Sequence, residues 1–545
     1  MSNNNNNSTH KLVNLPHILL SNIVDNLKDN IDKICFSLVC KRWFDNRNRY
    51  LLFNTKNFYC NYKDRSKITM NSYRSLIFES LNQKKQRTMF VTKDKNYIYH
   101  YDYTIDYDSI ESIDEIDQNI VKVIESREMI LREDSDKLYT RLYELIGKSN
   151  VTGLRKCMTL KYGIPMNITS LAFSYYFNEA LFKGCFPPNL KKLKFVGQFN
   201  QVIEVGVLPD TLESLEIGHL NQILEPGVLP TSLKILRITG SAPDNYLKVG
   251  SLPPNLEEFI QNGAYINIDS NVLPNSLITL GKVPLPWMKS IKPLENLRSL
   301  MVRRSTGCLD LSDLPQSLTR LDIFHSLSVL KSLPTSIKHL NIAYSEYDID
   351  ELFPDRSLYH FESLQVSPFK QESLDGLDIK RLLMEDDSVG EENSLATLRV
   401  IPFGVETLDI DVQCNFKFNQ NSLPSSLKTL NVYHMNSFIH PGIIPNSVNH
   451  LIIQVPRCDI HIAEGILPDS VQNIELKQVV FPTSSIVDNI SFEDYNFNKC
   501  SIRKLDDQYY IVFGHQKNKP FLIASLFHKS MFLDRVNVVK ILNGE

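Results

Sequence analysis

Apolar and polar positions repeat along most of this chain with a period of about 21 residues. From Val207 to Gly240 the phrase Leu-Pro-x-Ser/Thr-Leu-x-x-Leu-x-Ile is written twice, so that Leu215 in the first copy returns as Leu236 in the second. The last leucine of the phrase is used here as an anchor, and Leu382 is a further candidate anchor in an irregular acidic stretch from 370 to 405. The other anchors are Leu171, Leu193, Leu215, Leu236, Phe259, Leu280, Leu300, Leu321, Leu340, Leu364, Leu408, Leu430, Leu451 and Ile474.

Each part of the phrase predicts a local structure. The final Leu-x-Ile is a minimal β-strand, in which two apolar side chains point one way and the residue between them points the other way. Proline has no N–H to donate to a strand ladder, so it is expected at the bend before the strand. Between strands, as in FNQVIEVG from 199 to 206, Phe is expected to fill the core and Asn to bond the backbone of the adjacent coil. A unit this short cannot fold alone, so the units are predicted to stack as a parallel β-solenoid.

The period and the Leu-x-x-Leu-x-Leu core resemble a leucine-rich repeat. The additional Leu-Pro-x-Ser-Leu and Phe-Asn-Gln elements resemble the FNIP repeat, and this resemblance covers about residues 160 to 482. The Phe-Asn pair is present at Phe199-Asn200 and at Phe418-Asn419, but it is replaced in many other coils. The resemblance implies a solenoid in which each repeat contributes one strand.

Residues 12 to 53 have a helical pattern instead. Asp29-Asn30 separates two predicted helices, and helices this short leave apolar side chains exposed, which usually marks a partner surface. One predicted apolar stripe is Ile18, Ile23, Val24 and Leu27, and the other is Ile31, Ile34, Cys35, Leu38 and Val39.

The same segment resembles an F-box. Leu15-Pro16 opens the first helix, Ile23 and Leu27 follow, and the run Val39-Cys40-Lys41-Arg42-Trp43 closes the second helix. F-boxes dock on the small Skp adaptor, which links them to a cullin ubiquitin ligase. The alternative is that these helices only cap the solenoid. The resemblance implies adaptor-binding roles for Leu15, Pro16, Ile18, Val39 and Trp43.

The remaining segments have neither pattern. Between 54 and 150, alternating Tyr residues from Tyr97 to Tyr107 predict a strand, Ile113 to Ile124 has helical spacing, and so has Leu138 to Leu145. Acidic residues cluster from 102 to 117; a solvated face is the favoured interpretation and a carboxylate metal site the alternative. The predicted fold class is α+β. Its segments are a disordered Asn-rich tail (1–11), an F-box-like unit of three helices (12–53), a mixed connector (54–150), the solenoid (151–490) and a C-terminal cap (491–545).

Composition narrows the functional classes. The net charge is −3 and basic and acidic residues are mixed along the chain, which favours neither nucleic acid nor an anionic membrane as partner. The nine cysteines include no Cys-x-x-Cys pair, which argues against a disulfide framework or a zinc ribbon. No secretory signal or long apolar run is visible, so we expect a cytoplasmic or nuclear protein.

The sequence contains none of the common catalytic motifs. Phosphate-binding, dinucleotide-binding, zinc-protease and nucleophile-elbow motifs are absent from the sequence, and the Ser425-x-x-Lys428 match belongs to the repeat phrase. We therefore expect no catalytic residue, cofactor or metal. The better candidates are the central residues of the Leu-x-Ile strands, which are expected to face away from the core on a concave side and to bind a protein substrate. They are Glu216, Arg237, Met301, Asp322, Asn341, Asp409, Asn431 and Ile452.

Together these expectations describe the substrate receptor of a Skp-cullin-F-box ubiquitin ligase. The F-box-like helices would bind the adaptor, the solenoid would bind the protein to be modified, and neither would catalyse anything. The alternative is a protein-interaction scaffold with no link to a ligase. An enzyme built on a solenoid is a third class, for which the sequence offers no motif.

Overall fold

The computed structural model describes most of the chain. The described residues are 13–54, 71–82, 86–93, 103–197, 199–220, 222–240, 246–262, 266–303, 306–324, 327–367, 373–386, 396–397, 400–412, 416–418, 422–433, 441–454, 467–477, 488–493, 499–516, 519–528 and 530. The Asn-rich tail and the tyrosines from 97 to 101 lie outside these residues.

The chain forms two compact units. The first contains residues 1–84, 388–398 and 412–545, and the second contains residues 85–387 and 399–411. The first unit therefore joins the N-terminal helices to the C-terminal strands.

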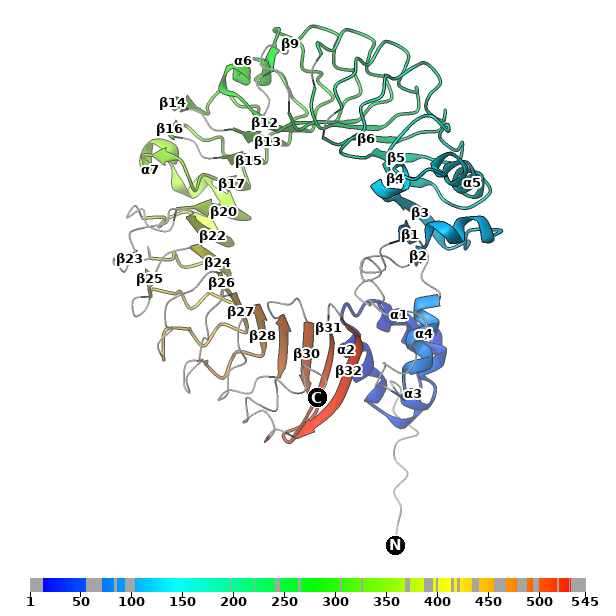
Figure 1. The fold of residues 1–545 in the computed structure, drawn as a ribbon. Coiled ribbons are helices and arrows are strands. Elements are labelled where there is room, and N and C mark those ends of the chain that lie inside the picture. The colour runs from blue at the N-terminus through cyan, green and yellow to red at the C-terminus, as the bar shows by residue number, and fades with distance from the viewer. Residues whose placement is uncertain are drawn as a thin grey trace. The chain divides into compact units, whose positions relative to one another are not determined.

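The second unit is a curved solenoid whose successive strands pair in parallel along its inner side, with the longer returning segments outside (Figure 1). Short strands pair with those of the next coil, while additional small strands lie in the outer segments. The inner strands, with β2 before β1 in the ladder, are β2 (Tyr103–Ile105), β1 (Arg87–Val91), β3 (Ile120–Glu125), β4 (Gly153–Cys157), β5 (Ser170–Phe173), β6 (Lys192–Phe195), β7 (Ser214–Ile217), β8 (Ile235–Ile238), β10 (Glu258–Gln261), β12 (Thr279–Val283), β13 (Ser299–Val302), β15 (Arg320–Ile323), β17 (His339–Asn341), β20 (Ser363–Val366) and β22 (Arg381–Asp386). Next along the chain is β24 (Thr407–Val412).

The strand register confirms the anchor positions. Leu215 is opposite Leu236 across β7 and β8, and each strand pairing from Leu171 to Leu364 joins one predicted anchor to the next. Leu364 pairs with Leu382, which makes this candidate an anchor too. The ladder also includes Leu154, which the sequence phrase does not reveal because its coil lacks the Leu-Pro element. Burial is complete at most of these side chains, so the anchors form the core row of the solenoid.

Glycine, phenylalanine and asparagine residues determine the structure of the outer segments. Gly206 and Gly227 occupy equivalent positions in successive coils with φ of 79° and 88°, a left-handed conformation that glycine adopts without steric cost. Phe177 and Phe199 are buried and stacked, with ring centroids 6.0 Å apart. The Asn178 side chain accepts a hydrogen bond from the backbone N–H of Asn200 in the next coil at 2.8 Å. The expected roles of Phe and Asn are thus confirmed at this pair of coils, and Phe177-Asn178 is a further copy of the pair.

The connector contains helix α5 (Ser135–Gly147), as the spacing of its leucines predicts. The helical expectation for 113–124 is wrong, because residues 120–125 form β3 between β1 and β4. Ile120 and Val123 are buried there by sheet pairing, which overrides the helical spacing. The connector is therefore continuous with the strand ladder.

In the first unit the strands β26 (Thr429–Tyr433), β27 (His450–Gln454), β28 (Asn473–Lys477) and β29 (Asn489–Glu493) are parallel neighbours. The direction then reverses. Antiparallel pairing joins β29 to β30 (Lys499–Lys504), β30 to β31 (Tyr509–Gln516) and β31 to β32 (Lys519–His528). The aromatic, alternating C-terminal segment thus ends the parallel array with hairpins.

Four short α-helices share a core with this antiparallel sheet: α1 (His17–Asp25), α2 (Asn30–Leu38), α3 (Lys41–Asp45) and α4 (Arg74–Asn82). Helix α2 contacts β30 and β31 directly. Their core includes Ile511 and Phe513 of β31, which are 7% and 9% exposed. The guanidinium group of Arg503 on β30 donates to Asp32 at 2.7 Å and to Asp29 at 3.1 Å. The helices are thus completed by strands that lie almost at the other end of the sequence.

Other elements are short. They are the 3₁₀ turns at Arg47–Arg49, Tyr107–Ser112, Arg127–Met129, Leu285–Trp287 and Arg356–Leu358, helices α6 (Met288–Ile291) and α7 (Ile349–Leu352), and strands β9 (Tyr246–Leu247), β11 (Asn267–Ile268), β14 (Thr306–Asp310), β16 (Leu327–Lys331), β18 (Glu346–Tyr347), β19 (His360–Phe361), β21 (Asp378–Ile379), β23 (Ala396–Thr397) and β25 (Phe416–Lys417). Among the helices in the described ranges, none has the length and apolar content needed to cross a bilayer.

Candidate interaction surfaces

The strand face of the solenoid is defined by the residues that flank each anchor. In β7, Leu215 and Ile217 are buried while Ser214 and Glu216 are partly exposed. This alternation places the residues before and after each anchor on the side of the sheet opposite the core. Of the eight substrate-binding residues expected there, Glu216, Met301 and Ile452 are half-buried and Arg237 is exposed.

The other four expected contact residues are buried, which corrects the prediction that they are open to a partner. Asp322 and Asp409 are 6% and 5% exposed, and Asn341 and Asn431 are equally hidden. The two aspartates are buried because each pairs with an arginine on the same face of the sheet. Arg320 Nε donates to Asp322 at 2.8 Å, and Arg381 Nε donates to Asp409 at 2.7 Å. Their carboxylates are therefore structural, and the paired guanidinium groups cover them.

Exposed charges on this face are also paired across neighbouring strands. Lys194 Nζ lies 2.5 Å from Glu216, and the guanidinium of Arg237 lies 2.7 Å from Glu258. Alternation alone places these side chains on the face, but it does not show which neighbour neutralises which charge. A partner that contacts Glu216 or Arg237 must therefore compete with an existing ion pair.

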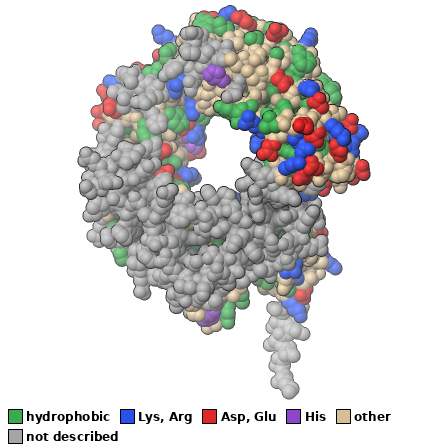
Figure 2. Space-filling view, viewed as in Figure 1, with side chains coloured by type: hydrophobic (Ala, Val, Ile, Leu, Met, Phe, Trp, Pro, Cys, Tyr) green, Lys and Arg blue, Asp and Glu red, His purple; other side chains and the backbone are tan. Residues whose placement is uncertain are grey.

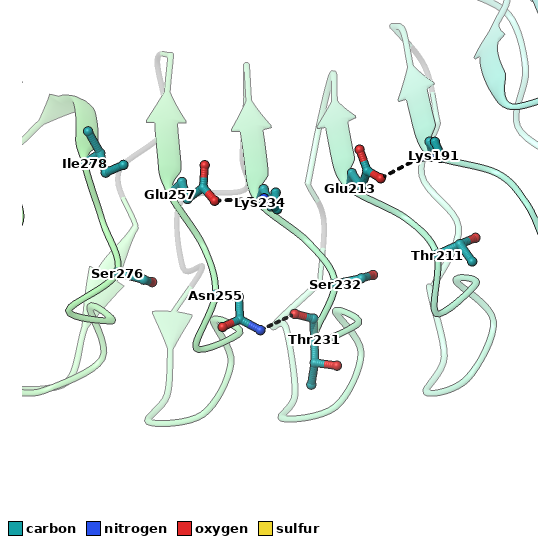
Figure 3. A pocket seen from close by; sticks show the side chains of 10 residues that line it. All are labelled: Lys191, Thr211, Glu213, Thr231, Ser232, Lys234, Asn255, Glu257, Ser276 and Ile278. Carbon is teal, nitrogen blue, oxygen red and sulfur yellow. Dashed lines mark hydrogen bonds and ion pairs between the residues drawn. The ribbon is translucent and has the colours of Figure 1, made fainter.

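A shallow polar groove of about 660 Å³ lies beside the strand face, where the chain enters the strands (Figure 3). Each coil contributes the residue two positions before its anchor, and in four successive coils these residues alternate in charge before Ile278 ends the row. Lys191 pairs with Glu213 at 2.9 Å, and Lys234 pairs with Glu257 at 3.1 Å. Sequence reasoning overlooked this row, although the alternation of Lys and Glu at one repeat position is its signal. Because its exposed ion pairs satisfy one another, the groove is a weaker candidate than the strand face.

The helices of the first unit expose an apolar patch, made of Ile18, Leu19, Ile23, Leu38 and Val39. Ile18 is 72% exposed and Val39 is 66% exposed. The first predicted stripe is therefore divided: Val24 is buried together with Leu20, while Ile18 and Ile23 face outward. Large exposed apolar side chains on such short helices are candidates for a contact surface.

Trp43 has a different position from the other predicted adaptor-binding residues. It is 7% exposed, its ring stacks on Phe36 with centroids 4.5 Å apart, and its indole N–H donates to the Val13 carbonyl at 3.2 Å. Trp43 therefore holds the helices together, whereas a docking side chain has to be accessible. Leu15 is half-buried and Pro16 is exposed at the start of α1.

One buried titratable cluster was missed by the sequence analysis. Glu125, at the end of β3, accepts a hydrogen bond from the Tyr143 hydroxyl at 2.7 Å and a longer one from Tyr139 at 3.4 Å. Burial raises the pKa of its carboxyl from an ordinary value of 4.5 to about 7, and the hydrogen bonds oppose this shift only partly. Cys157 lies beside Tyr143, and burial also raises the pKa of its thiol. The cluster faces the core, so its effect is on stability.

We expect Glu125 to make the stability of the second unit depend on pH. Between pH 4.5 and about 7 the folded chain binds more protons at this carboxyl than the unfolded chain does. The unfolding free energy therefore falls as pH rises through this window, by about 3 kcal/mol from this group. Glu125→Gln should flatten the slope in urea unfolding followed from about pH 5 to about pH 8. Glu128→Gln, at an exposed neighbour, is the control and should leave the slope as it is; an unchanged slope in Glu125→Gln contradicts the assignment.

Figure 2 shows acidic and basic side chains intermingled around α5, the region of the acidic cluster from 102 to 117. Arg87 pairs with Asp117, Arg132 with Asp108, and Lys137 with Glu111. In the part of the chain that the structure describes, no group of three His, Cys, Asp or Glu side chains is arranged to hold a metal ion.

Comparison with known proteins identifies the repeats. The model of the FNIP Repeat family matches residues 159–195, 177–220, 220–260 and 436–478. A crystal structure described as CroV588, a novel circular LRR protein, aligns over 72% of this chain and 71% of its own, with 19% sequence identity and a TM-score of 0.39. A search of the curated proteins found no match.

The class of protein follows from the fold and the family match. Short N-terminal helices are combined with a leucine-rich-repeat-like parallel β-solenoid, and this solenoid contains FNIP repeats. Stacked repeats of this kind offer an extended surface for binding other proteins.

Proposed function

We propose that this chain is the non-catalytic substrate receptor of a Skp-cullin-F-box ubiquitin ligase. The α1–α3 helices dock the Skp adaptor, which connects them to a cullin, and the solenoid binds the protein to be modified. The observation that carries the proposal is the exposed apolar patch on a helical unit that also has the Leu-Pro opening and the Val-Cys-Lys-Arg-Trp run of an F-box.

Three properties of the helical unit support a docking role. Its own core is closed by Leu20, Ile34 and Trp43, so the exposed Ile18 and Val39 are not required for folding. Apolar side chains at the centre of an interface contribute much of the affinity when a partner covers them. The helices are also anchored to the C-terminal sheet, which gives a docked partner a rigid platform.

Binding of a purified Skp adaptor tests this proposal. Replacing two exposed residues, Ile18→Glu with Val39→Glu, should abolish capture of the adaptor, because charges then enter an apolar contact. Val205→Glu is the matched control, since Val205 is 64% exposed on the solenoid; it should bind as the unaltered chain does.

Failure of the unaltered chain to capture the adaptor would reject the ligase role. The remaining function would then be that of an interaction scaffold, which the repeats alone support. The double variant must retain the Trp43 fluorescence of the folded helical unit for the comparison to count.

A further inference from the structure

The strand face carries a group of basic side chains on three of the four neighbouring strands β3 to β6. Lys122 of β3, Arg155 and Lys156 of β4, and Lys192 of β6 are exposed, and they are called the cationic face here. Lys122 precedes its anchor-row residue Val123, as Lys192 precedes Leu193, and Arg155 follows Leu154. These side chains therefore share the side opposite the core, and Figure 2 shows basic side chains along this part of the inner wall.

The packing keeps these cations on the open side of the sheet. Gly153 lies opposite Lys122 in the register, and a Cβ at Gly153 would be 3.0 Å from the Lys122 stem, so the lysine lies over the glycine. The ammonium of Lys156 lies 5.7 Å above the ring of Phe90 on β1. Neither arrangement neutralises the charge.

Charge compensation separates this region from the rest of the strand face. Further along the solenoid the charges are paired, as in Lys194 with Glu216, Arg237 with Glu258, and Arg320 with Asp322. Among the ion pairs of the described residues, none includes a side chain of the cationic face; the nearest compensation is at Lys192, whose charge acts on Glu213, and Glu213 is itself paired with Lys191. Unpaired like charges on adjacent strands repel one another, so an anion placed over them is favourable.

We propose that the cationic face binds a short anionic segment of a client protein, rich in Asp and Glu or phosphorylated. This proposal rests on the proposed function only in that the solenoid binds a protein client. Strands β3 to β6 span about 14 Å, a length that about four or five extended residues cover. Carboxylates or phosphates at that spacing lie within a Debye length of several of the cations.

Neighbouring features favour a protein segment over a nucleic acid. Tyr175 and Tyr176, just after β5, are 53% and 48% exposed, and exposed tyrosines are common in protein interfaces. Beyond β6 the charges of the same face are paired, as at Glu216 and Glu258, so the unpaired cations cover only a short segment and not the length of a polyanion. Nucleic-acid-binding domains are strongly basic, whereas this chain has a net charge of −3.

Fluorescence anisotropy with short labelled peptides tests the inference on the full chain. The probes are a glutamate-rich peptide, a phosphoserine peptide of the same length, a glutamine peptide, and a single-stranded oligonucleotide. The variant Lys122→Glu with Arg155→Glu and Lys192→Glu should bind the anionic peptides about tenfold or more weakly, a loss of about 1.4 kcal/mol. A second variant with glutamine at the same three sites should lose an intermediate amount of affinity for the anionic peptides. Because it removes the charges without reversing them, it controls for misfolding of the charge-reversed variant.

The matched control reverses three exposed lysines elsewhere, Lys148→Glu, Lys183→Glu and Lys289→Glu, and should bind as the unaltered chain does. The inference is supported if the glutamate-rich or the phosphoserine peptide binds more tightly than the glutamine peptide and the oligonucleotide. The tighter of the two anionic peptides identifies the preferred anion. The inference is overturned if the glutamine peptide binds as tightly as the anionic peptides, or if the charge-reversed variant binds the anionic peptides as tightly as the unaltered chain does. It is also overturned if the oligonucleotide binds most tightly of the four probes. Adaptor capture by the same variants should be unchanged, so failure of this inference is distinguishable from failure of the ligase role.

Discussion

Phe513→Ala is expected to destabilise the N-terminal helices by about 3 kcal/mol, although the substitution lies in a C-terminal strand. Phe513 of β31 is 9% exposed and belongs to the same core as Leu20, Ile34 and Trp43. Removing its ring leaves a cavity under α2, because neighbouring groups collapse only partly into such a space. The stability of the helices should therefore depend on a residue that the sequence places far from them.

Tryptophan fluorescence makes this effect visible. The chain has two tryptophans, so a Trp287→Phe background leaves Trp43 as the only reporter, and Trp43 lies inside the helical unit. The urea midpoint of the Trp43 transition should fall in Phe513→Ala. Leu526→Ala in β32 is the control, because Leu526 is 59% exposed, and its midpoint should stay the same. Equal midpoints for both variants would mean that the helices fold without the C-terminal sheet.

Leu236→Ala is the second substitution with a large expected effect, about 2 to 5 kcal/mol of unfolding free energy. Leu236 is fully buried and lies between Leu215 of β7 and Phe259 of β10 in the anchor row. A repeat contacts mainly its sequence neighbours, so the loss should be concentrated in the adjacent coils. Amide hydrogen exchange should show reduced protection in β7 and β10.

The adjacent residue supplies the control for this prediction. Arg237 is exposed, and its ion pair with Glu258 is worth less than about 1 kcal/mol at such a site. Arg237→Ala should thus leave exchange in β7 and β10 nearly unchanged. Equal protection loss in Leu236→Ala and Arg237→Ala would contradict the assignment of the anchor row to the core.

Most of the solenoid could be predicted from the sequence because its period is local and repeated. A leucine such as Leu215 recurs with the same neighbours, so its strand, its inward direction and its partner Leu236 all follow from the phrase. The prediction of a helix over 113–124 was wrong because this apolar run occurs only once, so no repetition supports one period over another. A single short apolar run fits either period, and pairing with β1 and β4 decided that residues 120–125 form a strand.

The surfaces were less predictable because they depend on contacts between distant positions. Alternation places Asp409 on the strand face, but the bond from Arg381 that buries it joins residues 28 positions apart. The helical pattern placed Ile18 and Val24 on one apolar stripe, whereas in the folded unit Leu20 and Val24 enter the core that includes Ile511 and Phe513, and Ile18 stays exposed. Which cations stay unpaired is likewise visible only when neighbouring strands are aligned.

The most direct test of two separate binding surfaces on one chain is a single set of titrations with two ligands. The purified Skp adaptor and the glutamate-rich peptide are each titrated into the unaltered chain, into Ile18→Glu with Val39→Glu, and into the charge-reversed Lys122, Arg155 and Lys192 variant. The account predicts that the first variant loses only the adaptor and the second loses only the peptide. The account would be contradicted if either variant lost binding of both ligands, or if both variants still bound both ligands.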